Sequence, residues 1–159
     1  MLVKAIVSGA LAIVVFVLVF SPAMAQDKPW FDVKNCDFCK QFGKDPELLK
    51  NMIWEYHDIS NGLMIITAVK PELKASYLAA QEGMEKVAQE MAQGKQDVKM
   101  CEHCRTYGAL MMSGVKFEHV PAGVGDIMLM TSEKPELLAQ IKDFAARCRE
   151  GQRELGKKE

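Results

Sequence analysis

Four of the five cysteines stand in two Cys-x-x-Cys motifs, and a histidine follows each motif in the chain. The cysteines are Cys36, Cys39, Cys101 and Cys104. The following histidines are His57 and His119. Two thiolates one helical turn apart can face the same ion, and an imidazole from a neighbouring strand can add a ligand. We therefore predict a metal site with the cysteines as primary ligands and the histidines as secondary ones.

The sequence is compatible with one metal site or two, and with more than one kind of ion. A separate site in each half needs a fourth ligand, such as His103, Asp37 or Glu102, or a water molecule. Alternatively, both motifs meet in one four-thiolate site. Zinc fits either arrangement, and Cu(I) is a second candidate because it accepts two or three soft ligands.

Two other interpretations compete with metal binding. The cysteine pairs could exchange disulfides, since a Cys-x-x-Cys at a helix N-terminus has a stabilised thiolate. However, neither motif has the Gly-Pro or Pro-His interior of thioredoxin-like proteins, and Asp37 and Glu102 disfavour a thiolate. In the third interpretation the protein is a small-molecule or protein-binding module, in which the cysteines are only structural.

The fifth cysteine and most methionines are expected to pack in the core. Cys148 falls on an apolar stripe of a predicted helix, where a free cysteine behaves as a small hydrophobic residue. The methionines follow helix and strand periodicities, so they are interpreted as packing residues rather than copper ligands.

An internal repeat organises the chain. Residues 32–40 read DVKNCDFCK, and residues 97–105 read DVKMCEHCR. The match continues to the sequence KPEL, which occurs at 70–73 and again at 134–137. We therefore expect a tandem duplication, with repeats at 26–94 and 95–159 that form one pseudo-twofold domain.

The periodicity of each repeat predicts an α+β fold of the type (β)αββα. Strands are expected at 53–57, 63–67, 115–119 and 127–131, with Asn61-Gly62 as the first hairpin turn. Short leading segments at 31–34 and 98–100 are candidate extra strands. Pro71 and Pro135 begin long helices. The expected result is an antiparallel sheet of four or more strands with two long helices packed on it.

The first 25 residues have the pattern of a signal peptide. Lys4 precedes an uncharged apolar run, and Ala23-Met24-Ala25 is a small-x-small cleavage sequence. Sixteen apolar residues fall short of the roughly 20 that span a bilayer. We expect a periplasmic or secreted protein without stable membrane insertion, whose partners are a metal ion and an exported protein. A net charge of −1 without a basic stripe argues against nucleic acid, and no catalytic motif indicates an enzyme.

Overall fold

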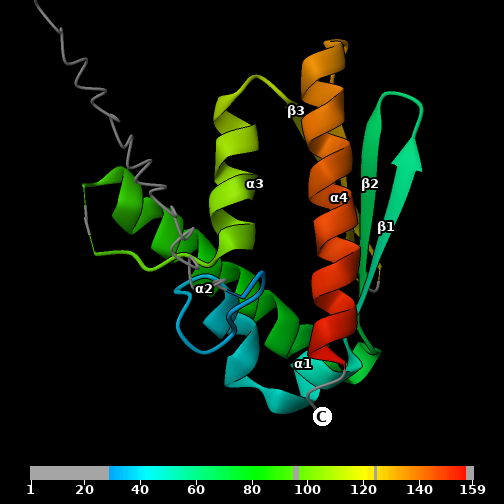
Figure 1. The fold of residues 1–159 in the computed structure, drawn as a ribbon. Helices are drawn as coiled ribbons and strands as arrows, with labels where there is room; N and C mark the ends of the chain where they lie inside the picture. Colours follow the sequence, from blue (N-terminus) through cyan, green and yellow to red (C-terminus); the bar gives the residue numbers. More distant parts are fainter. Residues whose placement is uncertain (1–28, 95–96, 124, 157–159) are drawn as a thin grey trace, which may run out of the picture.

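The computed structural model describes residues 29–94, 97–123 and 125–156. Its centre is a four-stranded antiparallel sheet of order β1-β2-β4-β3 (Figure 1). The strands are β1 (Ile53–Ile59), β2 (Gly62–Ala68), β3 (Lys116–Ala122) and β4 (Gly125–Thr131). The predicted α+β class, the four strands and their antiparallel pairing are confirmed. The predicted signal peptide at 1–25 lies outside the described residues.

The first hairpin forms where the sequence predicts it, but its turn lies one residue earlier. Ile59 pairs with Gly62, so Ser60 and Asn61 make the turn and Gly62 begins β2. Glycine is needed there because a Cβ atom on Gly62 would lie 1.9 Å from the carbonyl oxygen of Met130. The glycine therefore permits the close approach of strand β4, and no positive φ is involved.

One face of the sheet carries the core. Because side chains alternate along a strand, Leu63, Met130 and Phe117 lie in one row on the same face. Helix α4 (Pro135–Leu155) covers this face and buries Ile141 and Phe144 against it. The opposite face carries alternate residues, which belong to no core cluster of the described chain.

Two short 3₁₀ helices and three α-helices accompany α4 in the described chain. They are the 3₁₀ helices η1 (Cys39–Lys44) and η2 (Pro71–Leu73) and the α-helices α1 (Pro46–Asn51), α2 (Lys74–Ala92) and α3 (Glu102–Met112). Asp45 caps α1 by accepting hydrogen bonds from the amides of Glu47 and Leu48. Among the described residues, none of the helices combines the length and the apolar composition that a membrane span requires.

The prediction of two long helices packed on the sheet is wrong for α2. This helix reaches the sheet near its N-terminal end, where the Tyr77 hydroxyl donates a hydrogen bond to Asp126. Tyr77 and Ala80 are buried, but Met91 at the other end is 38% exposed. Helix α2 instead packs against η1, so its apolar stripe is covered over only part of its length.

The two leading segments are not strands. Residues 33–35 form a turn, and residues 97–100 have no regular structure. The turn forms because Asp32 Oδ1 accepts hydrogen bonds from the backbone amides of Lys34 and Asn35, at 3.1 and 2.9 Å. An aspartate that bonds amides two and three residues ahead bends the chain instead of extending it. This bend leads directly into Cys36.

Candidate metal centre

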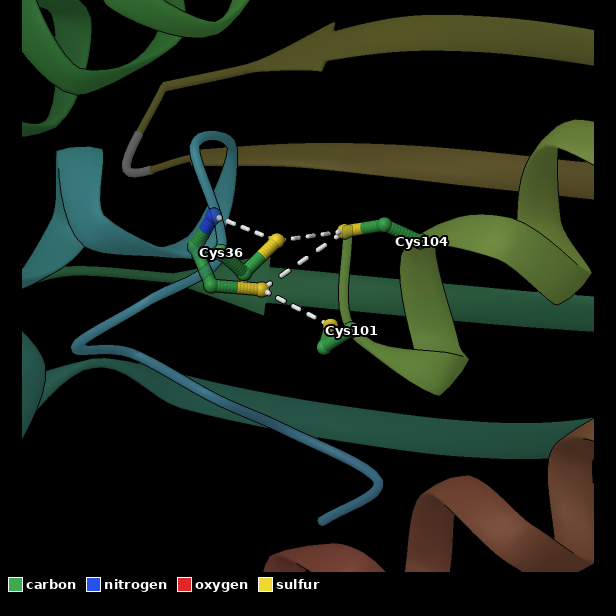
Figure 2. A group of neighbouring side chains, drawn as sticks. Cys36, Cys101 and Cys104 are labelled. Atoms are coloured by element: carbon green, nitrogen blue, oxygen red, sulfur yellow. Dashed lines mark hydrogen bonds between the residues drawn. The ribbon is translucent and has the colours of Figure 1, made fainter. Parts of the chain in front are cut away.

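Both Cys-x-x-Cys motifs converge on one point. The Sγ atoms lie 3.6 Å apart for Cys36 and Cys104, 3.5 Å for Cys39 and Cys101, and 3.6 Å for Cys39 and Cys104. All four Sγ atoms lie within 4.8 Å of one another (Figure 2). These separations are far longer than the ~2.05 Å of a disulfide bond. The arrangement is a single four-sulfur group that can hold a metal ion.

The first cysteine pair comes from the turn and from η1. Cys36 follows the Asp32 turn, and its amide donates a hydrogen bond to the Asp32 carbonyl at 3.1 Å. Cys39 begins η1, and its own amide points at Cys36 Sγ with a distance of 3.5 Å. This local loop presents two sulfur atoms on one side and supplies a backbone donor to the first of them. An N–H donor of this kind favours the thiolate form.

The second pair comes from the N-terminus of α3. Cys101 is the N-cap residue with an extended backbone, and Cys104 lies in the first turn of the helix. The helix dipole makes this end of a helix favourable for negative charge. Both cysteine pairs therefore sit where the backbone itself stabilises thiolates.

Asp37 joins the two segments beside the sulfur atoms. Its amide donates to the Lys99 carbonyl at 2.8 Å, and its Oδ2 accepts from the Lys99 amide at 2.8 Å. From the sequence alone, Asp37 is a candidate fourth ligand or an acid that disfavours a neighbouring thiolate. Its side chain instead fastens the first motif to the segment that precedes Cys101. The position between the two cysteines of a motif gave no signal of this long-range contact.

The thiols strongly influence one another's ionisation. Hydrogen bonds from Cys101, Cys104 and Cys39 lower the pKa of Cys36 below its usual range. The bond with Cys104 is the main cause that lowers the pKa of Cys101 to about 6. The pKa values of Cys39 and Cys104 are raised, in both cases first by the contact with Cys101. The four thiols therefore differ in acidity, and a metal ion, which binds the thiolate form, would favour ionisation of all four.

The apolar surroundings protect the group. Cys36 is 1% exposed and Cys101 is 4% exposed, and Val33 and Phe38 pack against them. Cys104 is the most accessible of the four cysteines. A buried set of thiolates without a cation is costly, because charges in an apolar environment lose their hydration.

The predicted histidine ligands do not join the sulfur group. His57 lies on the exposed face of β1, and its Nε2 is 2.8 Å from a carboxylate oxygen of Glu55. His119 lies on the helix-covered face of the sheet, and its Nε2 is 3.5 Å from Asp126. Among the described residues, the four cysteines alone make up the potential metal-binding group. The two strands direct these imidazoles elsewhere, so their role as secondary ligands is not supported.

His103 comes nearest to the group but serves the core. Its Nδ1 lies 3.9 Å from Cys104 Sγ, and its ring packs 4.7 Å from Phe31 and 5.3 Å from Phe144, measured between ring centroids. Burial lowers the pKa of His103 to about 4, which keeps the imidazole neutral at neutral pH. An aromatic cluster on one side and the sulfur atoms on the other therefore hold this ring in place.

The fifth cysteine is a core residue. Cys148 is fully buried and belongs to the cluster of Phe144, Ile141 and Leu137 between α4 and the sheet. Burial raises the pKa of its thiol to about 12. Cys148 therefore packs as a hydrophobic side chain, as its place on the helix stripe indicates.

The chain matches no protein-family model, no curated protein and no solved structure.

Proposed function

We propose that this chain is an exported, non-enzymatic zinc protein in which Cys36, Cys39, Cys101 and Cys104 bind one Zn²⁺. The single observation that carries the proposal is the convergence of four Sγ atoms within 4.8 Å of one another. A tetrahedron with Zn–S bonds of about 2.3 Å has edges of about 3.8 Å. Three of the six Sγ separations are 3.5–3.6 Å, close to that edge length, and the others do not exceed 4.8 Å.

Zinc is favoured over copper by the number of ligands. Cu(I) is satisfied by two or three soft donors, whereas a tetrahedral set of four thiolates is characteristic of zinc or iron. The sulfur atoms also lie too close together to enclose a cluster of several iron atoms with bridging sulfides. A single ion of tetrahedral preference is the best match to this group.

The closed ligand set supports a structural role for the ion. Catalytic zinc keeps one position for water or substrate, whereas structural zinc has four protein ligands. Here Cys36 and Cys39 lie at the start of η1, and the other two ligands lie at the start of α3, so one ion would bind two segments about 65 residues apart. The ion would also neutralise buried thiolates that otherwise repel one another.

Export and duplication complete the proposal. The signal-like segment at 1–25 and the small-x-small sequence before Gln26 support export to the periplasm or the exterior. The strand registers support an origin by tandem duplication, because a shift of 63 positions carries the pair Ile59–Gly62 onto the pair Ala122–Gly125. With that shift His119 corresponds to Tyr56 rather than to His57, in agreement with the opposite faces on which the two histidines lie.

The decisive experiment measures metal and thiols on the same sample. We expect protein purified without added metal or reductant to contain one zinc per chain and four thiols that react only after chelation. The double variant Cys101→Ser/Cys104→Ser should lose all of the bound zinc, since the site is shared. Loss of only half of the metal, or none, contradicts a single four-thiolate site.

Thiol–disulfide exchange is the competing function, and the same sample tests it. Two disulfides with no metal, together with reduction of insulin disulfides at a rate above background, would favour exchange. Copper or iron in place of zinc would keep the site and change only the identity of its ion.

A further inference from the structure

The face of the sheet opposite α4 is apolar and has no covering element among the described residues. Met64 pairs with Leu129 and Ile66 pairs with Ile127, so these four side chains form a central square. All four remain partly exposed. Val120 and Ile53 extend the apolar surface onto the edge strands, where they are 39% and 55% exposed.

Helices α4, α2 and α3 contact the other face. Helix α4 packs on β1, β2 and β4, and Tyr77 of α2 reaches Asp126. In α3, the ring of Tyr107 contacts Phe117 at a centroid distance of 5.2 Å. Both Asp126 and Phe117 belong to the covered face by strand alternation. These three helices therefore lie on one side of the sheet (Figure 1).

Polar residues border this apolar square at the two edge strands. Along one row the register places His57 on β1 and Glu118 on β3 at the ends, with Met64 and Leu129 between them. The adjacent row on this face has Glu55 at its β1 end. The surface thus has an apolar centre with two carboxylates and an imidazole at its rim.

This arrangement is complementary to itself. If two sheets pack face to face around a twofold axis parallel to the strands, β1 lies over β3 of the second copy. His57 then faces Glu118 of that copy, and Ile66 faces Ile127. If the axis is perpendicular to the strands, His57 faces Glu55 of the second copy, and Ile66 faces Met64. Both arrangements place apolar residues on apolar residues and a carboxylate beside the imidazole.

The size of the face suits a dimer of modest affinity. Four strands spaced about 4.8 Å apart and seven residues long at about 3.3 Å each cover about 440 Å². Two copies would bury about 900 Å², which is near the lower limit of about 1,000 Å² for a specific interface. The association should therefore be tested at micromolar concentrations.

We propose that two copies of this chain associate through the exposed sheet face, which turns two open sheets into a β-sandwich with the helices outside. Aligned sheets pack about 10 Å apart at an angle of about 30°, with the side chains of the inner faces between them. The inference is independent of the metal site, which lies on the helix side of the molecule.

Sedimentation velocity of the metal-loaded protein between about 1 and 100 μM tests the proposal. The wild-type protein should shift from monomer to dimer over this range. Ile53→Asp and Ile127→Asp should each raise the dissociation constant at least tenfold, and Ile53 is exposed enough that its replacement leaves the fold intact. Leu78→Asp is the matched control, because Leu78 is 52% exposed on α2 and lies away from the sheet face.

Charge reversal then identifies the axis. His57→Glu should weaken the dimer, because either arrangement puts two carboxylates together. Recovery on adding Glu118→Lys indicates the axis parallel to the strands, and recovery on adding Glu55→Lys indicates the perpendicular axis. A wild-type monomer at 100 μM overturns the proposal. A dimer that responds to Leu78→Asp but to neither sheet-face aspartate overturns it equally.

Discussion

Cys36 and Cys104 are separated by 68 positions in the chain, yet their Sγ atoms lie 3.6 Å apart. This contact joins the loop that precedes η1 to the first turn of α3. Since each of the two residues supplies one corner of the four-sulfur group, removing either should open the site. We expect Cys36→Ser to lower zinc affinity at least ~100-fold, because a hydroxyl is a poor substitute for a thiolate. Competition with a chromophoric chelator measures this change.

Cys148→Ala provides the matched control for the loss of a thiol. Cys148 is buried in the core and takes no part in the four-sulfur group. The variant should keep one zinc per chain and the wild-type affinity. It should lose about 1–2 kcal/mol of unfolding free energy through the small cavity that remains. Loss of zinc from this variant would show that the assignment of the ligands is wrong.

Removal of the metal should destabilise the contact between residues 32–39 and the start of α3 more than it destabilises the sheet. Without the ion, the four cysteines no longer share a bonding partner, and the loop of residues 32–39 separates from the start of α3. We expect chelation to lower the unfolding free energy by about 5 kcal/mol or more. Hydrogen exchange should quicken first at the amides of Asp37 and Lys99, which bond the two segments together.

The sheet provides the internal reference for that measurement. Strands β2 and β4 are central and hydrogen-bonded on both sides, so their amides should stay protected after chelation. Equal loss of protection in both regions would indicate that the ion stabilises the whole fold rather than the joined segments. Unchanged protection at Asp37 and Lys99 would contradict a structural ion at this position.

Asp126 makes stability depend on pH. Burial raises the pKa of this carboxyl above its usual 3.8, although the Tyr77 hydroxyl and Gln81 Nε2 donate hydrogen bonds to it. The folded state therefore holds its proton to a higher pH than the unfolded state does. The contribution of Asp126 is most favourable below pH 3.8 and is lost as the pH rises through the folded-state pKa.

The variant Asp126→Asn isolates this effect. The amide keeps an acceptor for Tyr77 but has no proton to lose. The unfolding free energy of the variant relative to that of the wild type should increase with pH across the window above 3.8 and then become constant. Urea denaturation at several pH values measures it. A difference that does not change with pH, or one that decreases, contradicts the proposed burial effect.

The sequence predicts the structure well where short-range patterns, such as side-chain alternation and residue spacing, determine it. Alternating apolar residues located the four strands, and Pro135 marked the start of α4. The spacing of Cys36 and Cys39 identified a candidate ligand pair because two side chains of one turn face the same way. The helix stripe placed Cys148 in the core. None of these inferences needs knowledge of which distant segments meet.

These short-range patterns do not predict which distant segments of the chain meet. That the two motifs share one group depends on the approach of α3 to η1, which no local pattern encodes. The sequence repeat aligns His57 with His119, but the strand registers differ from that alignment by one position. One position along a strand moves a side chain to the opposite face. Helix α2 carries an apolar stripe that suggested a sheet contact, although only its first turns reach the sheet.

Gly62 offers a test of the close approach between β2 and β4. A methyl group at Gly62 would lie 1.9 Å from the carbonyl oxygen of Met130, and backbone atoms cannot turn aside as a flexible side chain does. Gly62→Ala should therefore cost about 3 kcal/mol of unfolding free energy. Gly108→Ala is the control, since a Cβ at Gly108 in α3 meets nothing within 4 Å and alanine favours a helix by about 1 kcal/mol. Chemical denaturation of both variants should thus give changes of opposite sign. A Gly62→Ala protein as stable as the wild type would mean that the two strands lie farther apart than this register places them.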